Sequence, residues 1–146
     1  ALCGSMSEGS SVLSALAVGA DFAYVGTKFI ATEEANASPG YKQMIIDSTA
    51  NDIMYSATFT GVDGNYLRPS VVAAGLDPEE HTSGSKDDMN FSSSAIAKKD
   101  NSSKAWKDIW GSGQGIGSIK DAPSVEDAVD KMVEEYQEAK KRLDQF

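Results

Sequence analysis

Two glycine turns carry the residue types that could hold a phosphate group. Gly4-Ser5 follows one short apolar run, and Gly26-Thr27 follows another. Glycine lets the backbone approach an anion closely and adopt a positive φ angle, and the Ser and Thr hydroxyls add hydrogen-bond donors. Backbone N–H groups at these turns, and at the starts of the helices that follow, are expected to point at the anion.

The elements around these turns are expected to bring them together. Residues 1–3 have the pattern of a strand end, and residues 22–25 that of a short buried strand. Between them, apolar residues at helical spacing predict a helix that Ser7 opens and Gly19 closes. Strands joined through a helix are parallel, so both turns should lie at the same end of the sheet.

The spacing of the turns is that of a barrel. Positions 4 and 26 are 22 residues apart, about one repeat of a (β/α)₈ barrel, in which loops after the last two strands often bind phosphate. Two tight βα turns that bind nothing are the alternative, and the spacing alone leaves it open.

The rest of the chain has a looser pattern. Helices are predicted at residues 39–50 and 66–74, and a strand at 53–59, while residues 77–103 form a polar surface excursion. Ser124 opens the clearest helix, which has one apolar stripe and a charged opposite face. We therefore divide the chain into residues 1–50, two β/α units, and 51–146, an extension with that excursion and the final helix.

Composition narrows the classes of partner. The net charge of −9 argues against nucleic acid and against an anionic membrane, and no apolar run is long enough to span a bilayer. The single cysteine, Cys3, excludes an intrachain disulfide and fits a reducing, cytoplasmic compartment, with Cys3 as a small core residue. No metal site is predicted. Because residue 1 already lies in an apolar run, we expect further sequence upstream.

Several blocks resemble the nitronate monooxygenase family, formerly called 2-nitropropane dioxygenases. The resemblance rests on the blocks Ala-Leu-Cys-Gly-Ser-Met, Ala-Val-Gly-Ala-Asp and Val-Gly-Thr-Lys-Phe-Ile, and continues in Leu-Arg-Pro-Ser, Ala-Trp-Lys-Asp-Ile-Trp and Gly-Gln-Gly-Ile-Gly. It covers nearly the whole chain, with the polar excursion matched least. It implies an FMN-binding (β/α)₈ barrel that oxidises nitronates with molecular oxygen, of which this chain would be the C-terminal portion.

The resemblance also implies roles for particular residues. Gly4, Ser5, Gly26 and Thr27 match the family's turns for the FMN phosphate. Family members often have Gly-Gly at the first turn, so a left-handed backbone is not expected at Ser5. The family's first six strands and its catalytic histidine would lie upstream. His81, the only histidine here, does not match that motif, and no catalytic residue is assigned.

Two further residues have two interpretations each. Residues 111–117 fail the G-x-G-x-x-G spacing of a dinucleotide site. The resemblance puts a Gln-Gly turn near the active-site end, which makes Gln114 a candidate flavin or substrate contact, but a plain connecting loop is equally compatible. Lys28 could neutralise phosphate charge or could be a solvated or structural lysine.

These observations predict the C-terminal part of an FMN-dependent enzyme that uses a small-molecule substrate and O₂. A second polypeptide, or a parent chain cut by proteolysis, would supply the rest of the barrel, and the chain alone would be inactive. One alternative is an FMN-dependent enoyl reductase with the same barrel. Another is a non-catalytic fragment that needs a second chain, because two strands cannot close a barrel and their edges stay unpaired.

Overall fold

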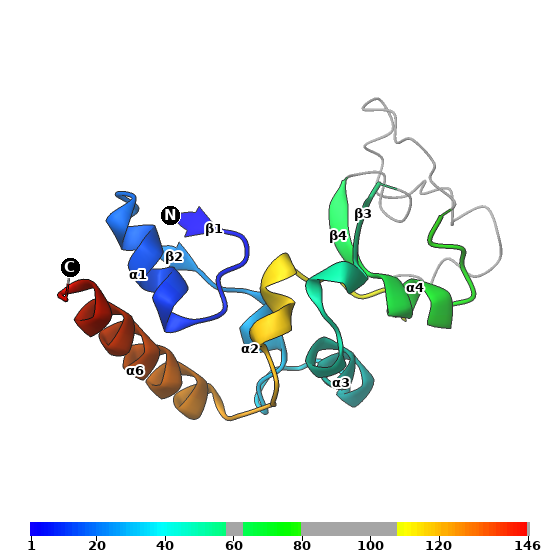
Figure 1. The fold of residues 1–146 in the computed structure, drawn as a ribbon. Coiled ribbons are helices and arrows are strands. Elements are labelled where there is room, and N and C mark those ends of the chain that lie inside the picture. The colour runs from blue at the N-terminus through cyan, green and yellow to red at the C-terminus, as the bar shows by residue number, and fades with distance from the viewer. Residues whose placement is uncertain (58–62, 80–107, 146) are drawn as a thin grey trace. The chain divides into compact units, whose positions relative to one another are not determined.

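The structure is a computed structural model that describes residues 1–57, 63–79 and 108–145 (Figure 1). It separates into two compact units. The first comprises Ala1–Ala50 together with Gly113–Phe146, and the second comprises Asn51–Ser112. The C-terminal residues therefore pack with the first fifty residues, although the sequence alone groups them with the extension.

The first unit is α/β. Its strands are β1 (Leu2–Cys3) and β2 (Ala23–Tyr24), and its helices are α1 (Gly9–Ala17), α2 (Thr27–Ile30), α3 (Pro39–Asp47), the 3₁₀ turn η4 (Gln114–Ser118) and α6 (Val125–Leu143). The predicted strand–helix–strand order is present, and β1 pairs with β2 in parallel. The 3₁₀ turn η1 (Ala50–Asp52) carries the chain into the second unit.

Local side chains explain where the helices begin and end. At α3 and α6 the predicted starts hold. Pro39 is the first residue of α3, and Ser38 before it accepts a hydrogen bond from the Tyr41 N–H. Ser124, predicted to open α6, accepts a hydrogen bond from the Asp127 N–H at 3.0 Å. The prediction of Ser7 as the cap of α1 is wrong. Glu8 occupies that position, and its N–H donates to the Ser11 hydroxyl at 3.3 Å.

Helices α1 and α6 pack side by side in the first unit. The contact needs small residues: Ala15 is fully buried on α1, and Ala128 and Ala139 are buried on α6. At Gly9 a Cβ would lie 2.0 Å from the Met132 carbonyl oxygen, so only glycine allows this approach. The tight packing joins the beginning of the described chain to its last helix.

The strand pair is more exposed than the sequence predicts. The run at residues 22–25 is of buried type, yet Phe22 is 72% exposed and Tyr24 69% exposed. Cys3, predicted in the core, is exposed as well. The physical reason is that a parallel sheet is normally covered on both faces by helices, and here the sheet has only two short strands.

The second unit is a hairpin followed by a helix. Strands β3 (Ile53–Ser56) and β4 (Gly64–Leu67) pair antiparallel, and α4 (Arg68–Ala73) follows directly. Met54, Val71 and Ile109 form its core. The prediction of one helix over residues 66–74 is wrong at its start, because Tyr66 pairs with Met54 across the hairpin and Pro69 suits the first turn of a helix.

Most of the polar excursion at residues 77–103 lies outside the described residues. No helix in the described ranges is long and apolar enough to cross a bilayer.

Candidate functional site

The two glycine turns leave the sheet at the same end. Cys3 pairs with Tyr24 at the end of the parallel ladder. Gly4-Ser5 follows Cys3 directly, and Gly26-Thr27 follows Tyr24 after one further residue, so both turns come at the carboxyl ends of their strands. Parallel α/β proteins bind their ligands at this carboxyl end of the strands.

The backbone of the first turn is left-handed at two successive positions. Gly4 has a φ of 91°, as its residue type allows. Ser5 has a φ of 53°, which makes it the only described non-glycine residue with a positive φ. The expectation that Ser5 would avoid this region is wrong: the turn imposes the geometry of a Gly-Gly turn on a serine, at a cost of about 1–2 kcal/mol.

Residues 113–118 contact both turns. The Gly113 N–H donates to Thr27 Oγ1 at 2.9 Å. A Cβ on Gly115 would lie 2.5 Å from Ser7 Oγ and 3.0 Å from the Ser5 backbone. The loop that carries Gln114 therefore lies directly against the first turn and is hydrogen-bonded to the second.

A polar pocket of about 180 Å³ lies where this loop meets the first turn. Ser5 and Gln114, predicted from sequence, both line it, whereas Gly4, Gly26 and Thr27 do not. Its other hydroxyls and its one carboxylate come from Ser7, Ser11, Ser118 and Glu8. The Ser11 hydroxyl already donates to the Glu8 carbonyl oxygen and the Ser118 hydroxyl to the Gly115 carbonyl oxygen, so the hydroxyls that the pocket can offer to a ligand are those of Ser5 and Ser7.

Ser7 is the residue that sequence reasoning missed. It is 3% exposed, lines the pocket, and within the described part of the chain its hydroxyl makes no hydrogen bond. Among the described residues no buried polar side-chain atom lacks a partner, so the Ser7 hydroxyl is not sealed in the interior and reaches the surface of this pocket. Gly115 was missed as well. Its position inside the Gln-Gly turn was the available signal for a close approach.

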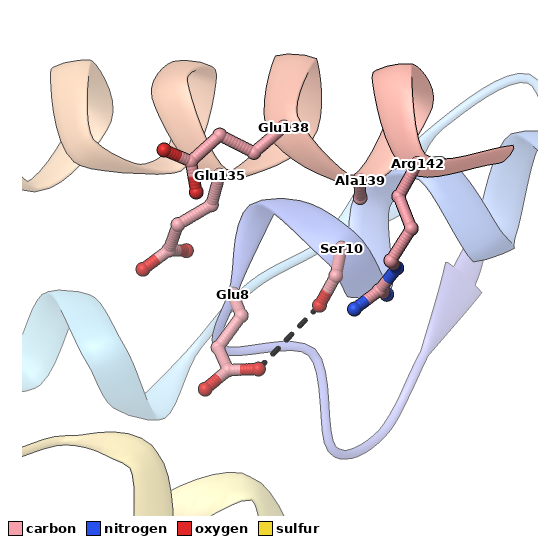
Figure 2. A pocket seen from close by; sticks show the side chains of 6 residues that line it. All are labelled: Glu8, Ser10, Glu135, Glu138, Ala139 and Arg142. Atoms are coloured by element: carbon pink, nitrogen blue, oxygen red, sulfur yellow. Dashed lines mark hydrogen bonds between the residues drawn. The ribbon is translucent and has the colours of Figure 1, made fainter. Parts of the chain in front are cut away.

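The start of α1 does not offer a free anion site. The Gly9 N–H donates to Glu135 Oε2 at 2.8 Å, so a carboxylate from α6 already occupies this helix start. Figure 2 shows Glu135 in the cleft of about 540 Å³ between the two helices, with Glu138, Arg142 and the hydrogen bond from the Ser10 hydroxyl to Glu8. The Gly9 N–H at the start of α1 is therefore not free to bind the anion expected at the turn.

Lys28 and His81 are the other two residues that the sequence analysis considered. Lys28 is only 7% exposed, so most of its side chain is buried, and in the described ranges its ammonium group forms no ion pair. His81 lies outside the described residues. No group of three His, Cys, Asp or Glu side chains that could hold a metal occurs in the part of the chain that the structure describes.

The comparisons with known proteins agree with the family resemblance of the sequence blocks. The pattern of the family described as nitronate monooxygenase matches residues 2–135. The chain belongs to the nitronate monooxygenase family. A curated nitronate monooxygenase from Paraburkholderia phytofirmans is 31% identical over 75 residues, which cover 51% of this chain and 20% of that protein.

Two solved structures have the same fold over almost the whole chain. FabK from Thermotoga maritima matches 98% of this chain and 45% of its own, with a TM-score of 0.68 and 22% identity. The nitroalkane oxidase from Streptomyces ansochromogenes matches 97% of this chain and 40% of its own, with a TM-score of 0.69 and 22% identity. The chain thus spans less than half the length of these family relatives and structural neighbours.

Proposed function

We propose that this chain provides the phosphate-binding turns of an FMN-dependent enzyme that oxidises nitronates with molecular oxygen in the cytoplasm. The observation that carries the proposal is that both glycine turns follow the carboxyl ends of the parallel strands and that residues 113–115 contact both of them, Gly113 at Thr27 and Gly115 at Ser5. Family membership supports the chemistry, because nitronate monooxygenase is the description of the family that matches. FMN would supply the redox chemistry, and the residues described here would bind and orient it.

The donor set fits a phosphate group. Gly4, Ser5, Gly26 and Thr27 would contribute backbone N–H groups. Thr27 Oγ1 accepts from Gly113, which leaves the hydroxyl hydrogen free to point at an anion. Lys28, buried directly after the second turn, would add positive charge to a chain whose net charge is −9.

The polar pocket beside the first turn would hold the part of the cofactor next to the phosphate. Its unpaired Ser7 hydroxyl suits a ligand that carries hydroxyl groups. Gln114 would donate to the same ligand from the opposite side, which is the contact that the resemblance implies. Glu8 lines this pocket too, so the phosphate itself is expected on the Thr27 side, away from that carboxylate.

The rest of a (β/α)₈ barrel would come from elsewhere, either a second polypeptide or the remainder of a parent chain. The exposed Phe22 and Tyr24 support this, because aromatic residues on parallel strands are usually covered. The chain spans only 20% of its curated relative, which leaves room for the other β/α units. The active site for the nitronate and O₂ would lie mainly on those units.

An enoyl reductase with the same barrel is the alternative activity. The fold does not choose, because FabK and the nitroalkane oxidase match the chain equally well. Nitronate-dependent oxygen uptake by the complete enzyme would identify the first activity, and NAD(P)H oxidation with an enoyl thioester the second. A non-catalytic fragment would show neither with any partner, and native mass spectrometry would find whether a heavier, flavin-bearing complex forms.

Phosphate binding by the two turns is tested by titrating the chain with FMN and with riboflavin, which lacks the phosphate. We expect FMN to bind more tightly, by at least about tenfold for charge-assisted hydrogen bonds. Thr27→Val should remove most of that preference and Thr27→Ser should retain it, since only the serine keeps a hydroxyl. Equal affinity for the two flavins in the unmodified chain, or no binding of either, would contradict the proposal.

A further inference from the structure

A lysine on α3 holds the segment that follows the second glycine turn. The Lys42 ammonium group donates to the Thr32 carbonyl oxygen at 2.6 Å and to the Glu33 carbonyl oxygen at 3.0 Å. Carbonyl groups just beyond the end of a helix have no partner within it, and a cation is favoured there. Lys42 therefore fixes the point at which the chain leaves α2.

The same segment is tied to the start of α6. The Glu33 N–H donates to the Pro123 carbonyl oxygen at 3.0 Å. The Val125 N–H, at the start of α6, donates to the Glu34 carboxylate at 2.9 Å. Residues 32–34 are thus held from α3 on one side and from α6 on the other.

Helix α2 can transmit this restraint because it is a single turn. Four residues rise about 6 Å, so a shift at one end moves the other. At its far end the Thr32 hydroxyl donates to the Phe29 carbonyl oxygen at 2.8 Å, and Thr32 is 1% exposed. At its near end stands Thr27, which Gly113 holds.

We propose that Lys42 is a positioning residue for the Gly26-Thr27 turn: it holds the exit of α2 and thereby sets where the Thr27 hydroxyl and N–H point. The inference rests on the proposed function of that turn in binding the FMN phosphate. Lys42 does not touch the ligand in this account. It acts through two carbonyl groups and one helical turn.

The test compares three variants of the chain in FMN and riboflavin titrations. Lys42→Met keeps the long apolar stem and removes the ammonium group, and we expect it to weaken FMN binding by roughly tenfold or more, as misplaced binding groups do. Riboflavin binding should not change, and Lys42→Arg should restore the FMN affinity. Gln43→Met is the matched control, because among the described residues the Gln43 side chain bonds only to Asp47, on the exposed side of the same helix.

Two results would overturn the inference: an unchanged FMN affinity in Lys42→Met, or an equal loss for both flavins, which a general loss of structure would cause. Should Lys42→Met fail to fold, Lys42→Gln makes the same comparison. If the unmodified chain itself does not prefer FMN, the proposed function has failed, and amide hydrogen exchange then decides the positioning role. Faster exchange at residues 27–34 in Lys42→Met, with α1 and α6 unchanged, would support it, and unchanged exchange there would refute it.

Discussion

Ser5 holds a backbone angle that its residue type disfavours. Its φ of 53° costs about 1–2 kcal/mol in an L-residue and nothing in glycine, although glycine also makes the unfolded chain more flexible, by about 0.4–1 kcal/mol. We therefore expect Ser5→Gly to raise the free energy of unfolding by up to about 1 kcal/mol, measured by urea denaturation. Ser5→Ala is the control, since it loses the hydroxyl and keeps the strain. If Ser5→Gly and Ser5→Ala lower the free energy of unfolding equally, the positive φ of Ser5 does not cost energy in the folded chain.

A half-buried tyrosine makes stability depend on alkaline pH. Burial raises the pKa of Tyr41 above its ordinary value of 10.0, because the phenolate loses solvation. The neutral form is thus preferred in the folded chain, and its contribution is complete below pH 10 and is lost as the pH rises through the folded-state pKa. We expect the free energy of unfolding to fall above pH 10, and to fall less in Tyr41→Phe. An identical pH dependence for the two proteins would exclude this role.

At the scale of residues, the five cofactor contacts predicted from the sequence stay predictions: Ser5 and Gln114 line the pocket, and Gly4, Gly26 and Thr27 do not. Glycine, serine and threonine after short strands mark anion turns by their chemistry, and Gln114 was found through the family resemblance. Ser7 could not be found, because its availability depends on burial beneath Gly115, which no local pattern encodes.

The packing of α1 against α6 requires that residue 9 is a glycine, which has no side chain. Alanine at position 9 would favour a helix, but its Cβ would lie 2.0 Å from the Met132 carbonyl oxygen and 2.4 Å from the Tyr136 nitrogen. Both atoms are backbone and cannot turn aside. Gly9→Ala is expected to destabilise the first unit by about 1–3 kcal/mol, measured by thermal or urea unfolding.

Gly117→Ala is the matched control for that variant, since a Cβ at position 117 meets nothing within 4 Å. Its stability should change by less than about 0.5 kcal/mol. A Gly9→Ala protein as stable as Gly117→Ala would show that the helices are further apart than described.

Among the helices and strands, the helices whose starts are marked by a capping residue were predicted best. Ser124 opens α6 and Pro39 begins α3 where expected, because a capping hydroxyl and a first-turn proline act locally. Strand β4 was missed, since Tyr66 belongs to a strand only through pairing with Met54. The apolar stripe of α6 was identified correctly as a stripe, but α1 covers only part of it, leaving Val129 and Val133 exposed at 43% and 54%.

For the whole molecule, the sequence predicted the α/β class of the first unit and the family, but it did not predict that the last helix packs against the first helix. That packing depends on backbone contacts between Gly9 and α6 and on the carboxylate of Glu135. A pattern read along the chain shows which face of a helix is apolar. It does not show which distant segment that face will meet.

The bond between Gly9 and Glu135 joins residues 126 positions apart. A ribosome adds about 5–20 residues per second, so the start of α1 emerges roughly 6–25 seconds before its carboxylate partner has been synthesised. During that interval the start of α1 lacks both its carboxylate partner and the helix that covers it. The packing of α1 can therefore be completed only after the last helix has been synthesised.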